Sequence, residues 1–107
     1  MVKKSIVKAV KRYLRVLPES GIHPTMAILY GSFARGEQRR YSDIDLVVVA
    51  PELEPPRTIE QVKKLWFTRK FADLRIEPIP CGVKEWKSGD GRPILEIARQ
   101  EGVIIKS

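Results

Sequence analysis

The stretch GSFARGEQRRYSDIDLVVV, from Gly31 to Val49, decides how the rest of the chain is interpreted. It places a Gly-Ser turn ahead of two carboxylates, Asp43 and Asp45, which stand at the head of an apolar run. Two negative charges one residue apart repel each other, so a strand built only for packing would not carry them. The stretch therefore points to a site that a positive group fills.

Length and composition set the class of protein. The chain has 107 residues, enough for a single domain over 1–107 with one core and too few for a second substrate domain. Hydrophobic residues make up 43% and charged residues 31%, which is ordinary for a globular protein and too apolar for a disordered one. No apolar run approaches the roughly 20 residues that span a bilayer. Because the first residues also lack a signal-peptide pattern, we expect a cytoplasmic protein without membrane contact.

The single cysteine and the single histidine are expected to carry no chemistry. Cys81 cannot form an internal disulfide and offers no metal-ligand spacing, so we expect it buried or half-buried at the end of a strand. His23 stands before a proline, a position that avoids helical angles, and is interpreted as a loop residue without a catalytic role.

The net charge of +7 favours an anionic partner. Most of the charge lies on two expected helices, in Lys3, Lys4, Lys8, Lys11, Arg12 and Arg15 and in Lys63, Lys64, Arg69 and Lys70. Such basic helices are more often solvated faces than nucleic-acid sites. Nucleic acid is the less favoured partner, because the aromatic residues do not alternate with the charges as a base-stacking surface requires. An acidic partner protein fits the charge equally well.

Apolar periodicity and turn signals predict helices alternating with strands. Ser32 is expected to cap the second helix, Thr58 and Gln61 to form a capping box, and Pro78 to place its strand near an edge. We expect Ile59, Val62, Leu65 and Trp66 to face inward. The predicted helices cover 3–17, 33–38, about 58–70 and 92–101, the strands 26–30, 44–49, 73–79 and 103–105, and a loop 82–91. The pattern indicates an α/β (α+β) fold with a small sheet flanked by helices.

The two aspartates suggest a metal site. Alternate residues of a strand share a face, which puts Asp43 and Asp45 side by side, about 6–7 Å apart, with Ile44 facing the core. Paired aspartates need a cation between them or a raised pKa. Mg²⁺ binds through one or two carboxylates plus substrate phosphates. The alternative is that the Ser-Asp pair is turn chemistry and that Asp45 pairs with a basic residue.

The Gly-Ser turn offers the other half of such a site. A glycine at position 31 lets a ligand approach the backbone, and a helix that starts at Ser32 presents free N–H groups to a phosphate. Two metal ions that hold the attacking and leaving oxygens of an in-line displacement need a third carboxylate. Glu77 is the first candidate, since it reaches the same metals if its strand lies beside the second strand, and Asp73 is the second candidate.

The stretch from Gly31 to Glu37, followed by SDIDLVV at 42–48, resembles the signature of the minimal nucleotidyltransferases of the DNA polymerase beta-like superfamily. That signature has a hydrophobic strand, Gly-Ser, a short helix with Ala-Arg-Gly, and Ser-Asp-x-Asp on the next strand. A basic first helix, an acid on the third strand and an ending like EGVII fit the same layout. The resemblance implies the polymerase beta-like nucleotidyltransferase fold.

The resemblance also implies roles for individual residues. Gly31 and Ser32 hold the triphosphate, and Asp43 and Asp45 bind Mg²⁺. The third acidic position falls on Glu77, where aspartate is commoner in the family; it would bind the metal that activates the acceptor hydroxyl and help to deprotonate that hydroxyl. The implied cofactors are two Mg²⁺ ions, which Mn²⁺ can replace.

Two polar residues of the nucleotide-binding stretch have open roles. Arg35 either contacts a phosphate or forms a structural ion pair. Ser42 is expected to orient the turn ahead of Asp43 rather than to contact the ligand.

The activity implied by the resemblance is Mg²⁺-dependent transfer of a nucleoside monophosphate, above all AMP from ATP, to a hydroxyl acceptor. Minimal nucleotidyltransferases are often encoded beside a small helical HEPN protein as antitoxin and toxin, and can adenylylate a tyrosine of that toxin. The acceptor is therefore expected on such a partner, in a homo- or hetero-oligomer. The alternative is a non-catalytic antitoxin that neutralises the partner by contact, and a nucleic-acid enzyme is a third, weaker interpretation.

Overall fold

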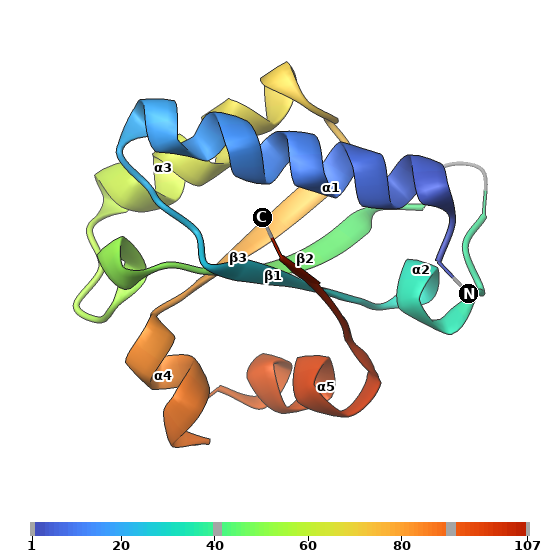
Figure 1. Cartoon of the computed structure of the whole chain (residues 1–107). Coiled ribbons are helices and arrows are strands. Elements are labelled where there is room, and N and C mark those ends of the chain that lie inside the picture. The colour runs from blue at the N-terminus through green and yellow to red at the C-terminus, as the bar shows by residue number, and fades with distance from the viewer. Residues whose placement is uncertain (1, 40–41, 90–91, 107) are drawn as a thin grey trace.

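The computed structural model describes residues 2–39, 42–89 and 92–106 and shows a four-stranded sheet with helices on both faces (Figure 1). The helices are α1 (Lys4–Val16), α2 (Ser32–Arg35), α3 (Ile59–Thr68), α4 (Val83–Ser88) and α5 (Pro93–Glu101). The strands are β1 (Met26–Tyr30), β2 (Ile44–Val49), β3 (Ile76–Cys81) and β4 (Val103–Lys106). Short 3₁₀ helices, η1 (Leu17–Ser20), η2 (Pro51–Leu53) and η3 (Arg69–Phe71), follow α1, β2 and α3.

The sheet is mixed and has the strand order β3-β2-β1-β4. β1 pairs antiparallel with β2 and with β4, whereas β2 and β3 run parallel. A parallel pair needs a crossover, and the chain between β2 and β3 supplies it as α3. The predicted α/β fold class with a small mixed sheet is confirmed, and β1 and β2 have the predicted bounds.

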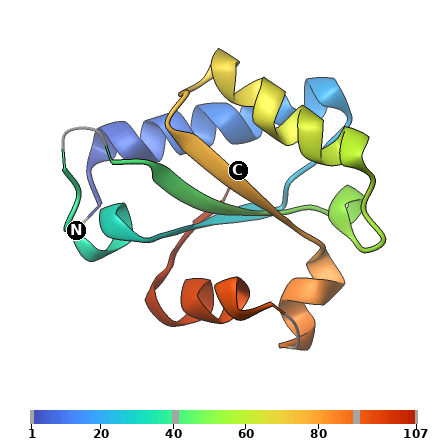
Figure 2. The same cartoon turned by 180° about the vertical axis from the view of Figure 1, so that it is seen from behind.

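The face of the sheet under α1 and α3 carries the larger core (Figures 1 and 2). Strand alternation turns Leu29, Leu46 and Ile76 to this face, where the apolar stripe of α1 covers them. The Tyr13 hydroxyl crosses this core and donates a hydrogen bond of 2.6 Å to the Leu65 carbonyl, which ties α1 to α3. This half of the molecule is held together by ordinary apolar packing.

The opposite face packs a smaller cluster under α4 and α5. Ile28, Val47 and Cys81 come from the sheet, and Leu95 and Ala98 come from α5. Cys81 is fully buried as the last residue of β3, which confirms the expectation for this thiol. In the part of the chain that the structure describes, no helix combines the length and apolar character that a membrane crossing needs.

β3 forms one edge of the sheet, as Pro78 predicted, but it begins later than expected. Residues 73–75 form a turn instead, because the Asp73 carboxylate accepts the Arg75 N–H at 2.9 Å and the Asp73 carbonyl accepts the Ile76 N–H. The carbonyls of Arg75 and Cys81 accept hydrogen bonds from the β2 side. Residues between them in the alternation, such as Pro78, point away from β2 to the open edge of the sheet. A missing N–H at Pro78 therefore breaks no hydrogen bond between strands.

α3 presents a different face to the core from the one expected. Its capping box is confirmed, since Thr58 and Gln61 exchange side-chain and backbone hydrogen bonds. Leu65 is buried, but the inward orientation of Ile59 and Trp66 was wrong: these side chains are 70% and 38% exposed. The inner stripe runs through Leu65 and Thr68, and the apolar residues outside that stripe meet no helix above them.

The segment predicted as a loop at 82–91 contains α4. Its free N–H groups are taken by acids: Glu54 accepts from Lys84 and Glu85, and the Glu85 carboxylate accepts the Gly82 N–H. A Cβ on Gly82 would lie within 1.6 Å of Glu54 Oε1, so this start of the helix needs glycine. The stabilising partner lies about 30 residues away, which local sequence patterns cannot reveal.

Candidate active site

A polar row crosses three strands at one end of the sheet. Asp45 on β2 is in register with Tyr30 on β1 and with Glu77 on β3. Residues directly opposite one another on paired strands project to the same face, so the three side chains stand next to each other. Tyr30 belongs to the cluster under α5, which places the row on the α4/α5 face. The condition set by the sequence, that β3 lies beside β2 with Glu77 near the aspartates, holds.

Asp43 lies one residue before β2 rather than on the strand, and is exposed. Its side chain still reaches the row, because Asp43 and Glu77 share a side-chain hydrogen bond and Asp43 acts electrostatically on Asp45. Asp73, the second candidate for the third acid, sits in the turn before β3 and forms an ion pair with Arg75 at 2.8 Å. The geometry thus groups Glu77 with the two aspartates and leaves Asp73 outside.

The row concentrates negative charge. Burial, followed by the charge of Asp43, raises the pKa of Asp45 above its ordinary value. Burial, followed by Asp43 and then Asp45, raises the pKa of Glu77, although Arg69 acts in the opposite direction. Burial and the two neighbouring carboxylates raise the pKa of Tyr30 to about 12. In all three groups burial is the largest cause and neighbouring carboxylates add to it, and a bound cation would oppose both effects.

The donor atoms suit a hard divalent cation, but the protein does not supply a complete cage. Among the described residues, no three His, Cys, Asp or Glu side chains are arranged so that they could hold a metal ion as they stand. Mg²⁺ does not require such a cage, since it keeps several waters and takes one or two carboxylates together with substrate phosphates. Asp45 with Asp43 or Glu77 matches that requirement, so the residues fit a metal that arrives with its nucleotide.

Gly31 brings the backbone of the next segment onto the acids. Its φ of 77° and ψ of −153° lie in a region that is essentially restricted to glycine. A Cβ built on Gly31 would lie 2.3 Å from Asp45 Oδ2. The Gly-Ser turn and the acidic row therefore form one continuous site, as the sequence predicted for its two halves.

Ser32 is the first residue of α2 rather than its cap, which corrects the expected boundary. Gly31 occupies the cap position, and Gly36, with a φ of 74°, ends the helix after four residues instead of at Gln38. The left-handed conformation of Gly36 ends the helix there, and the Glu37 N–H turns back to the Ser32 carbonyl at 2.9 Å. Within the described residues neither the Ser32 hydroxyl nor its N–H has a hydrogen-bond partner, so both remain available to a ligand.

Glu101, the last residue of α5, is the member of this region that the sequence did not reveal. Its carboxylate accepts the Gly31 N–H at 3.0 Å and two hydrogen bonds from Arg35. The Gly31 N–H, and with it Arg35, holds the pKa of Glu101 below its usual range. Of the two roles left open for Arg35, the structure shows the ion pair, with Glu37 and Glu101 as partners. Gly31 and Glu101 are 70 positions apart in the chain, so their spacing in the sequence did not indicate the contact.

Ser42 is held by Arg39. Its hydroxyl accepts the Arg39 N–H at 2.6 Å, and its own N–H donates to the Arg39 carbonyl at 3.0 Å. His23, as expected, is an exposed loop residue, bound to Glu52 at 2.9 Å. Neither residue contacts the acidic row.

Comparison with known proteins places the chain in a family. The model of the nucleotidyltransferase domain matches residues 4–103, from the first turn of α1 to the start of β4. The chain belongs to the nucleotidyltransferase domain family. A search of curated proteins found none that matches it. The matched region contains the whole acidic row and the Gly-Ser turn, and agrees with a minimal nucleotidyltransferase domain of the polymerase beta-like superfamily.

Membership accounts for the general chemistry. Members of this family are nucleotidyltransferases, and general nucleotidyl transfer is the activity that the match supports. An in-line displacement at phosphorus requires groups that hold a triphosphate and neutralise charge. The turn at Gly31 and the acids at Asp45 and Glu77 lie next to each other in an arrangement that suits this chemistry.

Proposed function

We propose that this protein transfers a nucleoside monophosphate, AMP from ATP, to a hydroxyl group of a partner protein in a Mg²⁺-dependent reaction. The observation that supports the proposal most directly is the register of Asp45 with Glu77, directly beside the glycine-only turn at Gly31. In the reaction the acceptor oxygen forms a bond to the α-phosphorus, the bond from that phosphorus to the bridging oxygen breaks, and pyrophosphate leaves.

The turn binds the triphosphate. The Ser32 hydroxyl and N–H are unpaired among the described residues and can donate to phosphate oxygens. The Gly31 N–H already donates to Glu101, so a phosphate either displaces that carboxylate or binds beside it. Gly31 contributes in another way, because the absence of a side chain lets the phosphates approach Asp45.

The acids hold the cation and orient the acceptor. Asp43 and Asp45 bind magnesium together with the phosphates, and Glu77 is the third ligand. Magnesium, when bound, neutralises the phosphates and lowers the pKa of an oxygen that it contacts. Glu77, whose pKa the neighbouring carboxylate charges raise, is suited to take up the proton of the acceptor hydroxyl. Its longer side chain, compared with the more common aspartate, reaches across from the neighbouring strand.

The acceptor is a tyrosine hydroxyl on a small helical HEPN-type toxin. This part of the proposal rests on the resemblance to minimal nucleotidyltransferases that act with such partners. The net charge of +7 suits an acidic partner as well as ATP. RNA as acceptor is the less favoured possibility.

A non-catalytic antitoxin is the second candidate, and one observation favours it. Glu101 occupies the N–H of Gly31, which a phosphate would otherwise use. A chain that had lost turnover would neutralise its partner through contact alone.

Transfer from α-labelled ATP to a co-purified HEPN-type partner distinguishes the two candidates. We expect label on the partner with Mg²⁺ and its loss in Asp43→Asn and Glu77→Gln, while Asp73→Asn, an acid outside the row, retains it. Complex formation should persist in every variant. Equal neutralisation of the toxin by wild type and Asp43→Asn, without label on either protein, would establish the binding subunit and refute the enzyme.

A further inference from the structure

The outer stripe of α3 is apolar where a surface helix is normally polar. Ile59, Trp66 and Phe67 lie along it with exposures of 70%, 38% and 60%, and Phe71 in η3 extends it with 60%. Leu65 and Thr68 already bury the inner stripe of the helix. A helix that carries large apolar groups opposite its core face has a second surface to cover.

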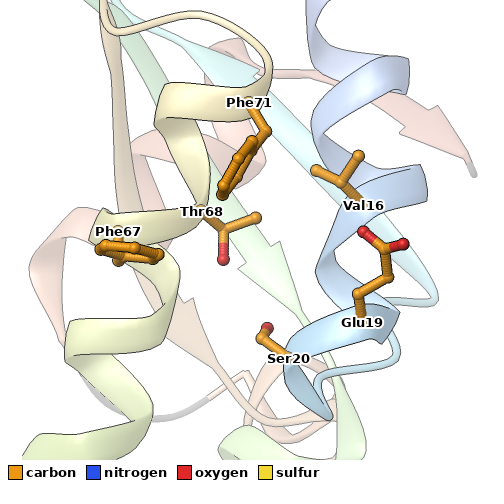
Figure 3. Close-up of a pocket in the computed structure, with 6 residues that line it drawn as sticks. All are labelled: Val16, Glu19, Ser20, Phe67, Thr68 and Phe71. Carbon is orange, nitrogen blue, oxygen red and sulfur yellow. The ribbon is translucent and has the colours of Figure 1, made fainter.

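A hollow lies next to this stripe. Val16 at the end of α1, together with Glu19 and Ser20 of η1, faces Phe67, Thr68 and Phe71 across a cavity of about 180 Å³ (Figure 3). An apolar cavity of about 150 Å³ can hold a benzene-sized molecule. The hollow therefore has room for one large apolar side chain, with the Phe71 ring and Val16 as its walls.

Positive charge lies along this stripe; the nearby acids are Glu19, which lines the hollow, and Glu60, 3.9 Å from Lys63. Lys70 lies 3.8 Å from the centre of the Phe67 ring and 5.3 Å from that of Phe71, and Arg69 stacks on Trp66 at 4.7 Å. Among the described residues no carboxylate pairs with Lys64 or Lys70. These contacts and its 38% exposure correct the expectation that Trp66 faces inward.

We propose that this surface, made of Ile59, Lys63, Trp66, Phe67, Lys70 and Phe71 and here called the α3 surface, binds an acidic amphipathic helix of a partner protein. One large apolar side chain of that helix enters the hollow, and flanking Asp or Glu residues meet Lys70 and its neighbours. Such helix-in-groove recognition combines an apolar anchor with complementary charge. The proposal concerns binding alone and does not depend on nucleotidyl transfer.

Two other occupants fit less well. A second copy of this chain would bring the same positive surface, and like charges oppose such pairing. Single-stranded nucleic acid would stack its bases on ring faces, but Lys70 already covers the face of the Phe67 ring. An acidic apolar segment satisfies both the rings and the lysines.

Direct titration with a designed peptide tests the proposal. The probe is an amphipathic helix of about 15 residues, long enough to be partly helical, with one apolar stripe and glutamate elsewhere. Its control has lysine at every glutamate position. We expect the glutamate peptide to shift the amide NMR signals of Val16, Ser20 and Phe67 in the ¹⁵N-labelled chain, and the lysine peptide to leave them unchanged.

Variants locate the contact. Phe67→Ser and Lys70→Glu should each weaken the peptide affinity about tenfold or more, as loss of a central anchor or an attracting charge does. Ile97→Ser is the matched control, because Ile97 is 45% exposed on α5, on the opposite face of the sheet, and should change the affinity less than about twofold. If Phe67→Ser does not fold, the peptide affinity of Lys70→Glu alone tests the proposal. Asp45→Asn should bind the peptide normally, which separates this proposal from the catalytic one.

Four results would overturn it. If the lysine peptide bound as tightly as the glutamate peptide, charge would not determine binding. If Ile97→Ser weakened binding as much as Phe67→Ser, the peptide would not bind at the α3 surface. Self-association that Phe67→Ser abolishes would assign the surface to a second copy. Tighter binding of an oligouridine probe than of the acidic peptide, mapped to the same residues, would assign it to nucleic acid.

Discussion

The two faces of the sheet differ in how regularly their apolar pattern continues. On the α1/α3 face, Ile44, Leu46 and Val48 follow one another along β2 without a polar interruption. On the α4/α5 face, the same strand places Asp45 ahead of Val47 and Val49. Where alternation is complete the residues serve packing, and on the other face the ionisable Asp45 interrupts the apolar pattern at the start of the strand.

Neighbouring residues of β2 provide the largest test of this difference. Asp45→Asn should reduce nucleotidyl transfer about 10³-fold, because it removes an electrostatic contact to the transition state, without lowering the melting temperature. The second expectation follows from the raised pKa of Asp45, which shows that its charge is unfavourable in the folded protein.

Leu46→Asn, one residue away on the other face, should cost about 4 kcal/mol of unfolding free energy, since it buries an unpaired amide in the core. Thermal melts followed by circular dichroism, with the transfer assay, check both. Equal destabilisation by the two substitutions would contradict the division between the faces.

The Gly31 turn gives a smaller effect that sharpens the comparison. Gly31→Ala should lower the unfolding free energy by roughly 2–3 kcal/mol, because the backbone conformation is restricted to glycine and the new Cβ meets the Asp45 carboxylate. Gly36→Ala serves as control: its φ of 74° is also unfavourable, but nothing lies within 4 Å of the new Cβ. We expect Gly36→Ala to lower the unfolding free energy by about 1 kcal/mol. Urea denaturation measures both, and similar values would mean that the contact with Asp45 carries no weight.

On the α4/α5 face, Glu85 tests a charge that serves packing rather than catalysis. It pairs with Arg57 at 2.7 Å and with Arg92 at 3.2 Å, and it accepts the Gly82 N–H. Burial alone would raise its pKa, but the Gly82 N–H and the arginines outweigh burial and lower it below the usual 4.5. Glu85→Gln should therefore cost about 2 kcal/mol at neutral pH.

The pH dependence of Glu85 has a definite sign. Because its pKa is lower in the folded than in the unfolded state, its stabilisation is complete above the ordinary value of 4.5 and disappears as the pH falls through the folded value. The difference between wild type and Glu85→Gln should shrink over that range. A difference that stays constant from pH 7 to about pH 3 would contradict the ion-pair account.

The smallest effect is expected in the larger core. Tyr13→Phe keeps the ring that fills the space between α1 and α3 and removes only the 2.6 Å hydrogen bond to the Leu65 carbonyl. We expect a loss of about 1 kcal/mol, the usual net value of one such bond. Guanidinium denaturation with an unchanged slope measures it. A loss as large as that for Leu46→Asn would mean that the hydroxyl, and not apolar packing, determines the stability of this face.

The elements that sequence patterns predicted correctly depend on local information. β1 and β2 are apolar runs ended by turn residues, and the capping box of α3 lies within four residues. The features that were mispredicted depend on distant contacts. α4 needs the carboxylate of Glu54, and α3 turns Leu65 and Thr68 to the core rather than the apolar face that its periodicity predicted.

The candidate site divides in the same way. The motif that runs from Gly31 to Asp45 was visible in the sequence, and the position of Glu77 beside Asp45 followed once β3 paired with β2. Glu101 was not predictable, because nothing near it in the chain indicates that the end of α5 packs against the Gly31 turn. The place of Tyr30 in the row follows from the pairing of β1 with β2, which the sequence did not specify.

The hydrogen bond from the Gly31 N–H to the Glu101 carboxylate has a practical consequence for handling the protein. It joins two residues that lie 70 positions apart, and its acceptor is at the C-terminal end of the last helix. A truncation that removes the end of α5 would remove this hydrogen bond and leave the Gly31 N–H without its Glu101 partner.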